Sequence, residues 1–374
     1  MAMSNKDLRA AKKQKKAEFY TQLKDVEKEL EYYKNEFKGK VVFCNCDDPY
    51  ESNFFKYFAM NFNYLGIKKL IATCFVTSSV KYSQLTLFDI NELKGEAANQ
   101  EKKPYKVEIS EVNDENGDGA IDLADVEYLI KNKKNILTLL HGDGDFRSQE
   151  CVELLKQADI VVTNPPFPLF REFVALMQDF QKDFIIIGNT NALTYKEVFK
   201  LFQSDSIRTG YTNFNVGMYF YVPDNYEKYH RIIDGKKAVR VSNSCWYTTL
   251  PVKKHNDMLV SVKKYSPKNY KKYYNFDAIN INNYNDIPEN YDGMMGVPVT
   301  FLDKFNPQQF ELIGLGISNS GIEIGVNPYT LEHSTYRKLV QHKCAVNGDL
   351  YMLDEEGHPD VPYARIIIRR KHHE

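Results

Sequence analysis

The sequence predicts an α/β protein whose parallel sheet is covered by helices on both faces. Over the first half of the chain, short runs rich in β-branched residues alternate with longer amphipathic stretches. Strands and helices in such alternation are typical of parallel sheets. The chain has 374 residues, of which 43% are hydrophobic, so it is long enough to bury a substantial core in one or two domains.

The expected elements follow one another in order. Residues 1–17 are rich in lysine and have no apolar periodicity, which indicates a flexible basic arm. From residue 18 to about residue 37, apolar and aromatic residues recur at helical spacing and indicate an amphipathic helix. After it, the patterns predict strands at residues 40–44, 69–75, 160–163 and 184–188, and helices at residues 52–65, 149–156 and 169–180.

The texture of the sequence changes near residue 225. Beyond this point tyrosine and asparagine are more frequent, turns multiply and helical periodicity fades. Ligands of open α/β sheets bind beyond the carboxyl ends of the strands. We therefore expect the ligand site in residues 18–225 and a second, recognition-type region in residues 226–374.

Composition argues against several classes of protein. No apolar run reaches the roughly 20 residues that span a bilayer, and the N-terminus does not resemble a secretion signal, so we expect no membrane partner. The six cysteines match no common zinc or redox spacing and are expected to be reduced thiols of a cytoplasmic protein. Because the formal net charge is -1, any nucleic-acid surface has to come from local clusters of basic residues.

A four-residue motif, Asn164-Pro165-Pro166-Phe167, directly follows the expected strand at residues 160–163. An aromatic amine is a poor nucleophile because its lone pair is delocalised into the ring. The Asn164 side-chain oxygen and the Pro165 carbonyl can accept hydrogen bonds from the two N–H groups of such an amine. The prolines fix the backbone, and Phe167 offers a flat face to an extruded base. The motif favours amino-group chemistry that depends on alignment and needs no metal. The alternative is that the prolines only end the strand, with Asn164 capping the next helix.

A second pattern, in residues 114–125, is typical of a calcium loop. Around a glycine that the sharp turn requires, it places five oxygen ligands: Asp114, Asn116, Asp118, Asp122 and Asp125. The loop ends in aspartate where calcium loops usually have a bidentate glutamate. An acidic turn that caps a helix over residues 123–130 explains the same residues equally well. Any calcium ion here would be structural.

Residues 262–274 interleave basic and aromatic side chains. Lysines neutralise phosphates, and tyrosines stack on bases or hydrogen-bond to nucleic acid. We expect contact with nucleic acid through Lys263, Lys264, Lys268, Lys271 and Lys272. The C-terminal residues Arg365, Arg369 and Arg370 are expected to add to this basic face. The alternative is a solvated loop with packing tyrosines.

Six stretches of the chain together carry a resemblance to a known family. They are residues 18–21, 44–49, 52–58, 142–147, 164–167 and 295–302. Asn-Pro-Pro-Phe is one form of the motif of amino-group methyltransferases, and over these stretches the chain resembles the EcoRI-type adenine-specific DNA methyltransferases. The resemblance implies a Rossmann-like S-adenosylmethionine-dependent methyltransferase sheet with a C-terminal target-recognition region. It further implies methyl transfer to N6 of an adenine flipped out of double-stranded DNA, with residues 76–135 as an insertion.

The resemblance also implies a set of cofactor-binding residues: Tyr20, Thr21, Asp47, Asp48, Pro49, Asp145 and Phe146. The first two would lie near the methionine carboxylate, and one of the two adjacent aspartates would hold the ammonium group. The last pair would accept a hydrogen bond from the adenine amine and stack on its ring. Ser52 and Asn53 depart from the glycines usual in the cofactor loop, and no acidic residue follows the second strand to bind the ribose hydroxyls.

Two other classes of function stay open from the sequence. One is an enzyme with the same amino-group chemistry acting on cytosine N4, RNA or a protein glutamine. The other is a non-catalytic DNA-binding protein whose cofactor loop has degenerated. The resemblance favours restriction-modification or host DNA protection, in which a cognate restriction endonuclease acts without forming a stable complex.

Overall fold

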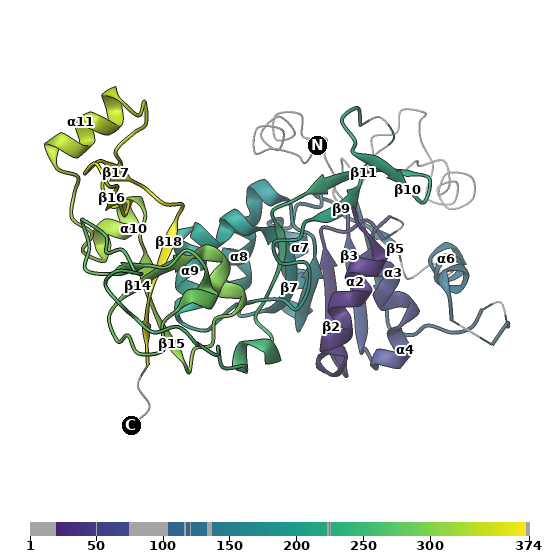
Figure 1. Cartoon of the computed structure of the whole chain (residues 1–374). Coiled ribbons are helices and arrows are strands. Elements are labelled where there is room, and N and C mark those ends of the chain that lie inside the picture. The colour runs from purple at the N-terminus through teal and green to yellow at the C-terminus, as the bar shows by residue number, and fades with distance from the viewer. Residues whose placement is uncertain are drawn as a thin grey trace. The chain divides into compact units, whose positions relative to one another are not determined.

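The computed structural model describes residues 20–49, 51–74, 104–115, 117–119, 121–132, 137–222, 224 and 226–371. The expected basic arm at residues 1–17 and a large part of the expected insertion, residues 76–103, lie outside the described residues. The chain divides into two compact units: Met1–Asn189 with Gly210–Leu250, and Thr190–Thr209 with Pro251–Glu374. Figure 1 labels the elements of both units.

The first unit contains the expected parallel strands. Four strands lie side by side in the order β3-β2-β6-β7 and all run parallel: β3 (Lys69–Thr73), β2 (Val41–Asn45), β6 (Ile160–Thr163) and β7 (Asp183–Asn189). These confirm the four predicted strands. Antiparallel strands, which the sequence patterns did not predict, extend the sheet on both sides: β4 (Tyr105–Ile109) and β5 (Leu137–Leu139) beyond β3, and β12 (Ser244–Thr248) beyond β7.

Helices connect the parallel strands. The single helix predicted at residues 52–65 is divided at Asn61 into α3 (Asn53–Met60) and α4 (Phe62–Leu65), and the Asn61 side chain donates to the Tyr57 carbonyl (2.8 Å). The other two predictions are confirmed by α7 (Gln149–Gln157) and α8 (Phe170–Asp179). The crossover through α3 leads from β2 to β3, and the crossover through α8 leads from β6 to β7. The two crossovers therefore run in opposite directions along the sheet. Because parallel crossovers are right-handed, α3 and α8 are expected on opposite faces.

The N-terminal segment differs from the single helix predicted over residues 18–37. It begins as the short strand β1 (Tyr20–Thr21) and continues as α2 (Leu23–Leu30) and the 3₁₀ helix η1 (Glu31–Phe37). Tyr20 and Thr21 are extended because they pair with β9 (Met218–Tyr221), which is followed in the same small sheet by β11 (Lys236–Val241) and β10 (Arg231–Ile233). The apolar face predicted for this segment is buried, including Val26 and Leu30.

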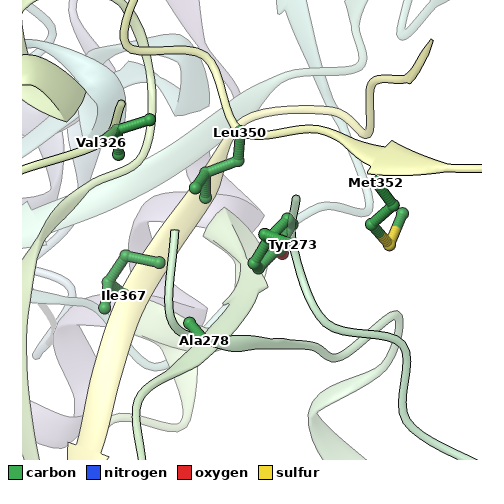
Figure 2. Close-up of a cluster of buried hydrophobic side chains, with 6 residues drawn as sticks. All are labelled: Tyr273, Ala278, Val326, Leu350, Met352 and Ile367. Carbon is green, nitrogen blue, oxygen red and sulfur yellow. The ribbon is translucent and has the colours of Figure 1, made fainter. Parts of the chain in front are cut away.

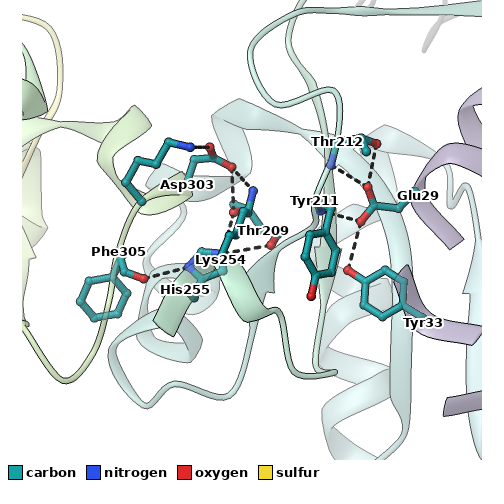
Figure 3. Close-up of polar contacts among 10 residues, drawn as sticks. Glu29, Tyr33, Thr209, Tyr211, Thr212, Lys254, His255, Asp303 and Phe305 are labelled. Atoms are coloured by element: carbon teal, nitrogen blue, oxygen red, sulfur yellow. Dashed lines mark hydrogen bonds and ion pairs between the residues drawn. The ribbon is translucent and has the colours of Figure 1, made fainter. Parts of the chain in front are cut away.

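A buried carboxylate holds the start of residues 210–250 to the first unit, in addition to the pairing of β9 with β1 and of β12 with β7. Glu29 on α2 accepts hydrogen bonds from the backbone N–H groups of Tyr211 and Thr212 (both 2.7 Å) and from the Tyr33 hydroxyl (3.0 Å), as Figure 3 shows. Burial raises the pKa of Glu29. The compact unit therefore continues to Leu250, whereas the sequence texture places a boundary near residue 225. The assignment of a recognition role to residues 226–374 concerns function and stays a prediction.

The second unit is built around a sheet of four strands in the order β13-β14-β18-β15: β13 (Ile279–Asn280), β14 (Met295–Pro298), β18 (Arg365–Arg370) and β15 (Phe310–Leu315). A buried cluster around Tyr273, Leu350 and Ile367 packs in this unit (Figure 2). Its helical elements are η3 (Thr190–Thr194), α9 (Lys196–Gln203), η4 (Lys253–Asn256), η5 (Tyr284–Asp286), η6 (Val299–Asp303), α10 (Ser318–Glu323) and α11 (Leu331–Leu339). The short strands β8 (Arg208–Thr209), β16 (Met352–Leu353) and β17 (Pro359–Asp360) complete it.

A buried histidine orders the second unit. His255 Nδ1 donates to the Phe305 carbonyl (2.8 Å), and Nε2, the acceptor of a neutral imidazole, lies 3.2 Å from the Thr209 hydroxyl, as Figure 3 shows. Burial lowers the pKa of His255. None of the helices in the described part of the chain has the length and apolarity that a bilayer crossing requires.

Candidate active site at the carboxyl ends of β2 and β6

The Asn164–Phe167 motif lies at the point where the strand order reverses. It follows β6 directly, and β6 is the neighbour of β2. Pro165 is buried and Pro166 is exposed, while Asn164 is half-buried. The residue before the 3₁₀ helix η2 (Phe167–Leu169) is Pro166, and α8 is preceded by Leu169. The alternative in which Asn164 caps the next helix is therefore wrong, and its side chain sits in the strand-end loop.

The aromatic residue of the motif is held from a different element. Phe167 is half-buried, and its ring meets that of Phe220 on β9 edge to face, with centroids 6.1 Å apart and an interplanar angle of 88°. Phe220 is fully buried. An edge-to-face contact fixes the orientation of the Phe167 ring. Strand β9 is thus part of the site, although it is distant in the sequence.

Asp47 connects the two strand ends. Its carboxylate accepts from the hydroxyl of Ser52 (2.7 Å) and from the hydroxyl of Thr163. Burial raises the pKa of Asp47 to about 6, against the opposing effect of these hydrogen bonds. Because Thr163 immediately precedes Asn164, this carboxylate fixes the start of the Asn164–Phe167 motif relative to the end of β2.

The loop after β2 explains the departure from a glycine-rich sequence. The Ser52 hydroxyl accepts from the backbone N–H groups of Phe54 (3.1 Å) and Phe55 (3.3 Å) and so caps α3. Asn53 donates from Nδ2 to the Thr21 carbonyl (2.7 Å) and joins β1 to the same loop. Serine and asparagine at these positions therefore stabilise the loop with side-chain hydrogen bonds, where glycines would offer only backbone.

Asp48 is joined to a strand that the sequence patterns did not predict. The Tyr105 hydroxyl on β4 donates to Asp48 Oδ1 (2.9 Å), and both side chains are buried. Pro49, the residue after Asp48, is also buried. Tyr105 lies within the stretch expected to be an insertion, so this stretch contributes a contact to the loop after β2.

Asp145 is held in its ionised form by a neighbouring arginine. Arg147 donates from Nε and from one terminal nitrogen to the two carboxylate oxygens (both 2.8 Å) and also pairs with Glu172. These hydrogen bonds lower the pKa of Asp145. A carboxylate has about four lone-pair directions, so Asp145 can accept from a further amine. Phe146 is buried and packs on Phe173, with centroids 5.1 Å apart.

Polar atoms near β1 fit a polar ligand. Thr21 and Gln22 are 3% and 2% exposed, and neither Thr21 Oγ1 nor Gln22 Nε2 has a hydrogen-bond partner among the described residues. A buried polar atom left without a partner costs about 1–3 kcal/mol. Such atoms are therefore suited to a ligand with donors and acceptors, as the amino-acid part of S-adenosylmethionine has.

The basic segment of the second unit is largely paired with acids. All five predicted lysines are exposed, but Lys263 pairs with Asp286 (2.6 Å) and Lys272 with Asp277 (3.2 Å). Lys264 lies 3.8 Å from Glu289. For the other two, Lys268 and Lys271, the described residues provide no acidic partner within ion-pair distance. These two carry the strongest remaining case for contact with phosphates.

Two tyrosines of this segment and one of the C-terminal arginines are buried inside the second unit. Tyr270 and Tyr273 are buried, and the Tyr273 hydroxyl donates to Asn280 (2.8 Å). Arg365 is 7% exposed and donates from Nε to Asn280 (3.1 Å). The expectation that Arg365 adds to a basic surface is therefore wrong, because its guanidinium is used inside the unit.

The other two C-terminal arginines also have intramolecular partners. Arg369 pairs with Glu311 (2.7 Å), and Arg370 donates to the Pro288 carbonyl (2.9 Å) while lying over the Phe310 ring. Both side chains stabilise the neighbourhood of β15 and β18.

The acidic loop at residues 114–125 leads into α6 (Leu123–Asn132), where Asp122 accepts from the N–H group of Ala124 (2.6 Å). Asp114 accepts from the N–H groups of Gly117 (2.6 Å) and Gly119 (2.7 Å), and Asp125 accepts from Glu115 and Asp122 (both 2.9 Å). Asn116 lies outside the described residues. Among those described, no group of three acidic, histidine or cysteine residues is placed to hold a metal ion. These hydrogen bonds stabilise the loop, and the calcium site stays a prediction.

Comparison with known proteins decides the family. The family model described as adenine-specific methyltransferase EcoRI matches residues 7–371. The chain belongs to this family. It is 43% identical over 349 residues to the type II methyltransferase M.EcoRI of Escherichia coli, covering 91% of this chain and 97% of the relative. It is 37% identical over 311 residues to type II methyltransferase M.MpnI of Mycoplasma pneumoniae, covering 81% and 83%. It is 33% identical over 373 residues to M.MgeORF184P of Mycoplasma genitalium, covering 96% and 98%. No solved structure matches significantly.

For this member of the EcoRI methyltransferase family, sequence reasoning missed three residues that hold the candidate site together. Thr163 was signalled only by its place before Asn164, and Arg147 only by its closeness to Asp145. Tyr105 had no local signal, since its partner Asp48 is 57 positions away in the chain. The family match does not itself assign roles to these side chains, so the roles are argued from chemistry below.

Proposed function

We propose that this protein transfers a methyl group from S-adenosylmethionine to N6 of adenine at a specific sequence in double-stranded DNA. The first compact unit would be its Rossmann-like catalytic domain. Residues 226–374, of which residues 226–250 also belong to that unit, would supply target recognition. The observation that carries the proposal is the position of Asn164–Phe167 at the reversal of strand order beside the loop after β2. This is where ligands of open α/β sheets bind.

The catalytic residues act on the amine of the target base. Asn164 Oδ1 and the Pro165 carbonyl accept hydrogen bonds from the two N–H groups of this amine. These hydrogen bonds draw the nitrogen lone pair out of conjugation with the ring and aim it at the methyl group. Pro165 and Pro166 fix the backbone so that both acceptors stay in place. The sulfonium of S-adenosylmethionine supplies an activated methyl group when bound. No catalytic metal is required, because alignment of the acceptors with the amine supplies the rate enhancement.

The target base has to leave the duplex to reach these acceptors. Its amine is buried by pairing and stacking, and extrusion costs a few kcal/mol. Phe167 offers the flat surface that replaces the lost stacking, and Phe220 holds that ring in orientation. Lys268 and Lys271 are proposed to contact phosphates of the flanking DNA.

The cofactor residues divide into binding and positioning groups. Both oxygens of Asp47 accept from hydroxyls, so we assign Asp47 to positioning Asn164 and its neighbour Asp48 to the ammonium group. Asp145 would accept from the adenine amine, with Phe146 against the ring. Tyr20 and Thr21 would line the methionine carboxylate. A structural calcium ion at residues 114–125 would have to share carboxylates that already accept backbone N–H groups.

We further propose that the protein acts in the cytoplasm in restriction-modification or host DNA protection. Three relatives of this chain are named type II methyltransferases. A cognate restriction endonuclease would recognise the same DNA sequence separately, without a stable complex with this chain.

The test is incubation with radiolabelled S-adenosylmethionine and unmethylated duplex DNA, followed by nucleoside analysis. Label in N6-methyladenine at one repeated sequence is the expected result. Label in N4-methylcytosine, or in RNA or protein glutamine instead of DNA, would overturn the substrate assignment. DNA binding without any binding of S-adenosylmethionine would indicate a non-catalytic protein.

A further inference from the structure

An asparagine at the end of β2 has no assigned role. Asn45 is the last residue of β2 and is 1% exposed. Neither its Oδ1 nor its Nδ2 has a hydrogen-bond partner among the described residues. The residues before it in the strand, from Val41 to Cys44, are buried and apolar.

The strand register places Asn45 in a short row of buried polar residues. Asn45 lies opposite Thr73, the last residue of β3. On the other side, Val42 and Phe43 lie opposite Ile160 and Val161 of β6. If the same register is followed two residues further, Asn45 is level with Thr163. Three neighbouring strands therefore end in a buried polar layer at their carboxyl ends, where Asp47 and Asn164 follow in the chain.

The energetics of Asn45 differ from those of its two neighbours in the row. A threonine hydroxyl rotates to find a partner, and Thr163 donates to Asp47. A primary amide brings two N–H donors and a carbonyl acceptor, and leaving them unsatisfied costs about 1–3 kcal/mol. An apolar residue of similar size at this position would make the folded protein more stable, because no polar atom would be left unsatisfied. Buried polar groups left unmatched in the fold call for an explanation, and a ligand that completes them is one.

We propose that Asn45 is a cofactor-binding residue that holds the ribose of S-adenosylmethionine. Oδ1 would accept from one ribose hydroxyl and Nδ2 would donate to the oxygen of the other. A vicinal diol has both donors and acceptors, as the amide does. The ammonium group and the adenine amine of the cofactor already have acidic candidates in Asp48 and Asp145, whereas residues 71–77 offer no acid for the diol. The inference rests on the proposed function, since it names a contact to the same cofactor.

The test uses calorimetric binding of S-adenosylhomocysteine, which carries no methyl group to transfer, and of its 2′,3′-dideoxy counterpart. Wild type is expected to bind the dideoxy compound more weakly, and Asn45→Val is expected to bind S-adenosylhomocysteine about 10- to 100-fold more weakly. The variant should also lose most of the discrimination between the two ligands. Equal weakening of both ligands would overturn the ribose assignment in favour of another part of the cofactor.

Thermal unfolding of the ligand-free protein separates this role from a structural one. Asn45→Val should melt at the wild-type temperature or above it, because an unsatisfied amide is removed. The matched control is Asn306→Val, since Asn306 is also buried but donates to the carbonyls of Asn256 (3.1 Å) and Asp257 (3.3 Å). The control should lower the melting temperature and leave ligand affinity unchanged. A lower melting temperature for Asn45→Val with unchanged affinity would overturn the inference.

The wild-type measurements keep the two proposals distinguishable. If wild type binds neither S-adenosylmethionine nor S-adenosylhomocysteine, the proposed function itself fails. If wild type binds both and labels DNA, while Asn45→Val binds equally well, only the ribose assignment fails.

Discussion

The strand-end site and the basic segment of the second unit were both indicated by sequence, but they differ in what the fold does with their side chains. At the strand ends, Asp47 joins Ser52 to Thr163 and so fixes the residue before Asn164. In residues 262–274, three of the five lysines pair with acids, and Tyr270 and Tyr273 are buried. A motif tied to the end of a strand keeps its geometry, whereas a surface inferred from composition depends on which charges meet across loops.

The largest expected effect is at the strand ends. Asn164→Ala removes one of the two acceptors of the target amine, and loss of one such preorganised group lowers turnover by about 100- to 1,000-fold. Cofactor affinity should change by less than about twofold, since the acceptor is aimed at the base and not at the cofactor. Single-turnover methylation and calorimetry measure the two quantities. Near-normal turnover would contradict the mechanism.

Removal of Lys268 and Lys271, which have no acidic partner in the part of the chain that the structure describes, should sharpen the contrast within the basic segment. The double variant Lys268→Ala/Lys271→Ala is expected to weaken DNA binding and to reduce the slope of log affinity against log salt by about 2, because two phosphate contacts are lost. The matched control is Lys263→Ala/Lys272→Ala, in which both lysines already have acidic partners. Equal changes in both double variants would show that the ion pairs do not decide DNA contact.

The buried Asp47 predicts an unusual pH dependence of stability. Its pKa is raised by burial from 3.8 to about 6, so between these values the folded protein keeps a proton that the unfolded chain has released. Wild type should therefore lose stability relative to Asp47→Asn as the pH rises from about 4 to about 6, by on the order of 1–3 kcal/mol. Urea unfolding of both proteins at pH 4.5 and 7.5 measures the change. The opposite trend would mean that the hydroxyl contacts outweigh the effect of burial.

The smallest expected effect concerns the acidic loop. Its carboxylates accept backbone N–H groups of the loop and of Ala124 at the start of α6, so calcium or a chelator should shift the melting temperature by less than about 1 °C, which corresponds to under about 1 kcal/mol for a chain of this size. Asp125→Ala should lower the melting temperature with or without calcium, because its hydrogen bonds to backbone N–H groups are lost. A calcium-dependent rise of several degrees that Asp125→Ala abolishes would instead indicate a structural ion site.

Local sequence patterns were sufficient for the parallel strands, for the helices α7 and α8 and for the position of Asn164 after a strand. Each of these depends on residues close together in the chain, where periodicity and the strand-to-loop transition are directly visible. The extended conformation of Tyr20 and Thr21 was not predicted, because it comes from pairing with β9 some 200 residues away. The buried Arg365 was misjudged for the same reason, since its partners Asn280 and Asn282 are far from it in sequence.

The sequence by itself determined the family, the parallel sheet and the residues that carry the proposed chemistry, because motif identity and hydrophobic period are properties of short segments. Only the tertiary structure decided that Asp47 links two strand ends, that Tyr105 contacts Asp48 and that the buried Asn45 amide has no hydrogen-bond partner among the described residues. It also decided which lysines are paired and that residues 210–250 pack with the first unit. These features depend on long-range pairing and burial, whose free energies arise between segments that the order of residues does not place side by side.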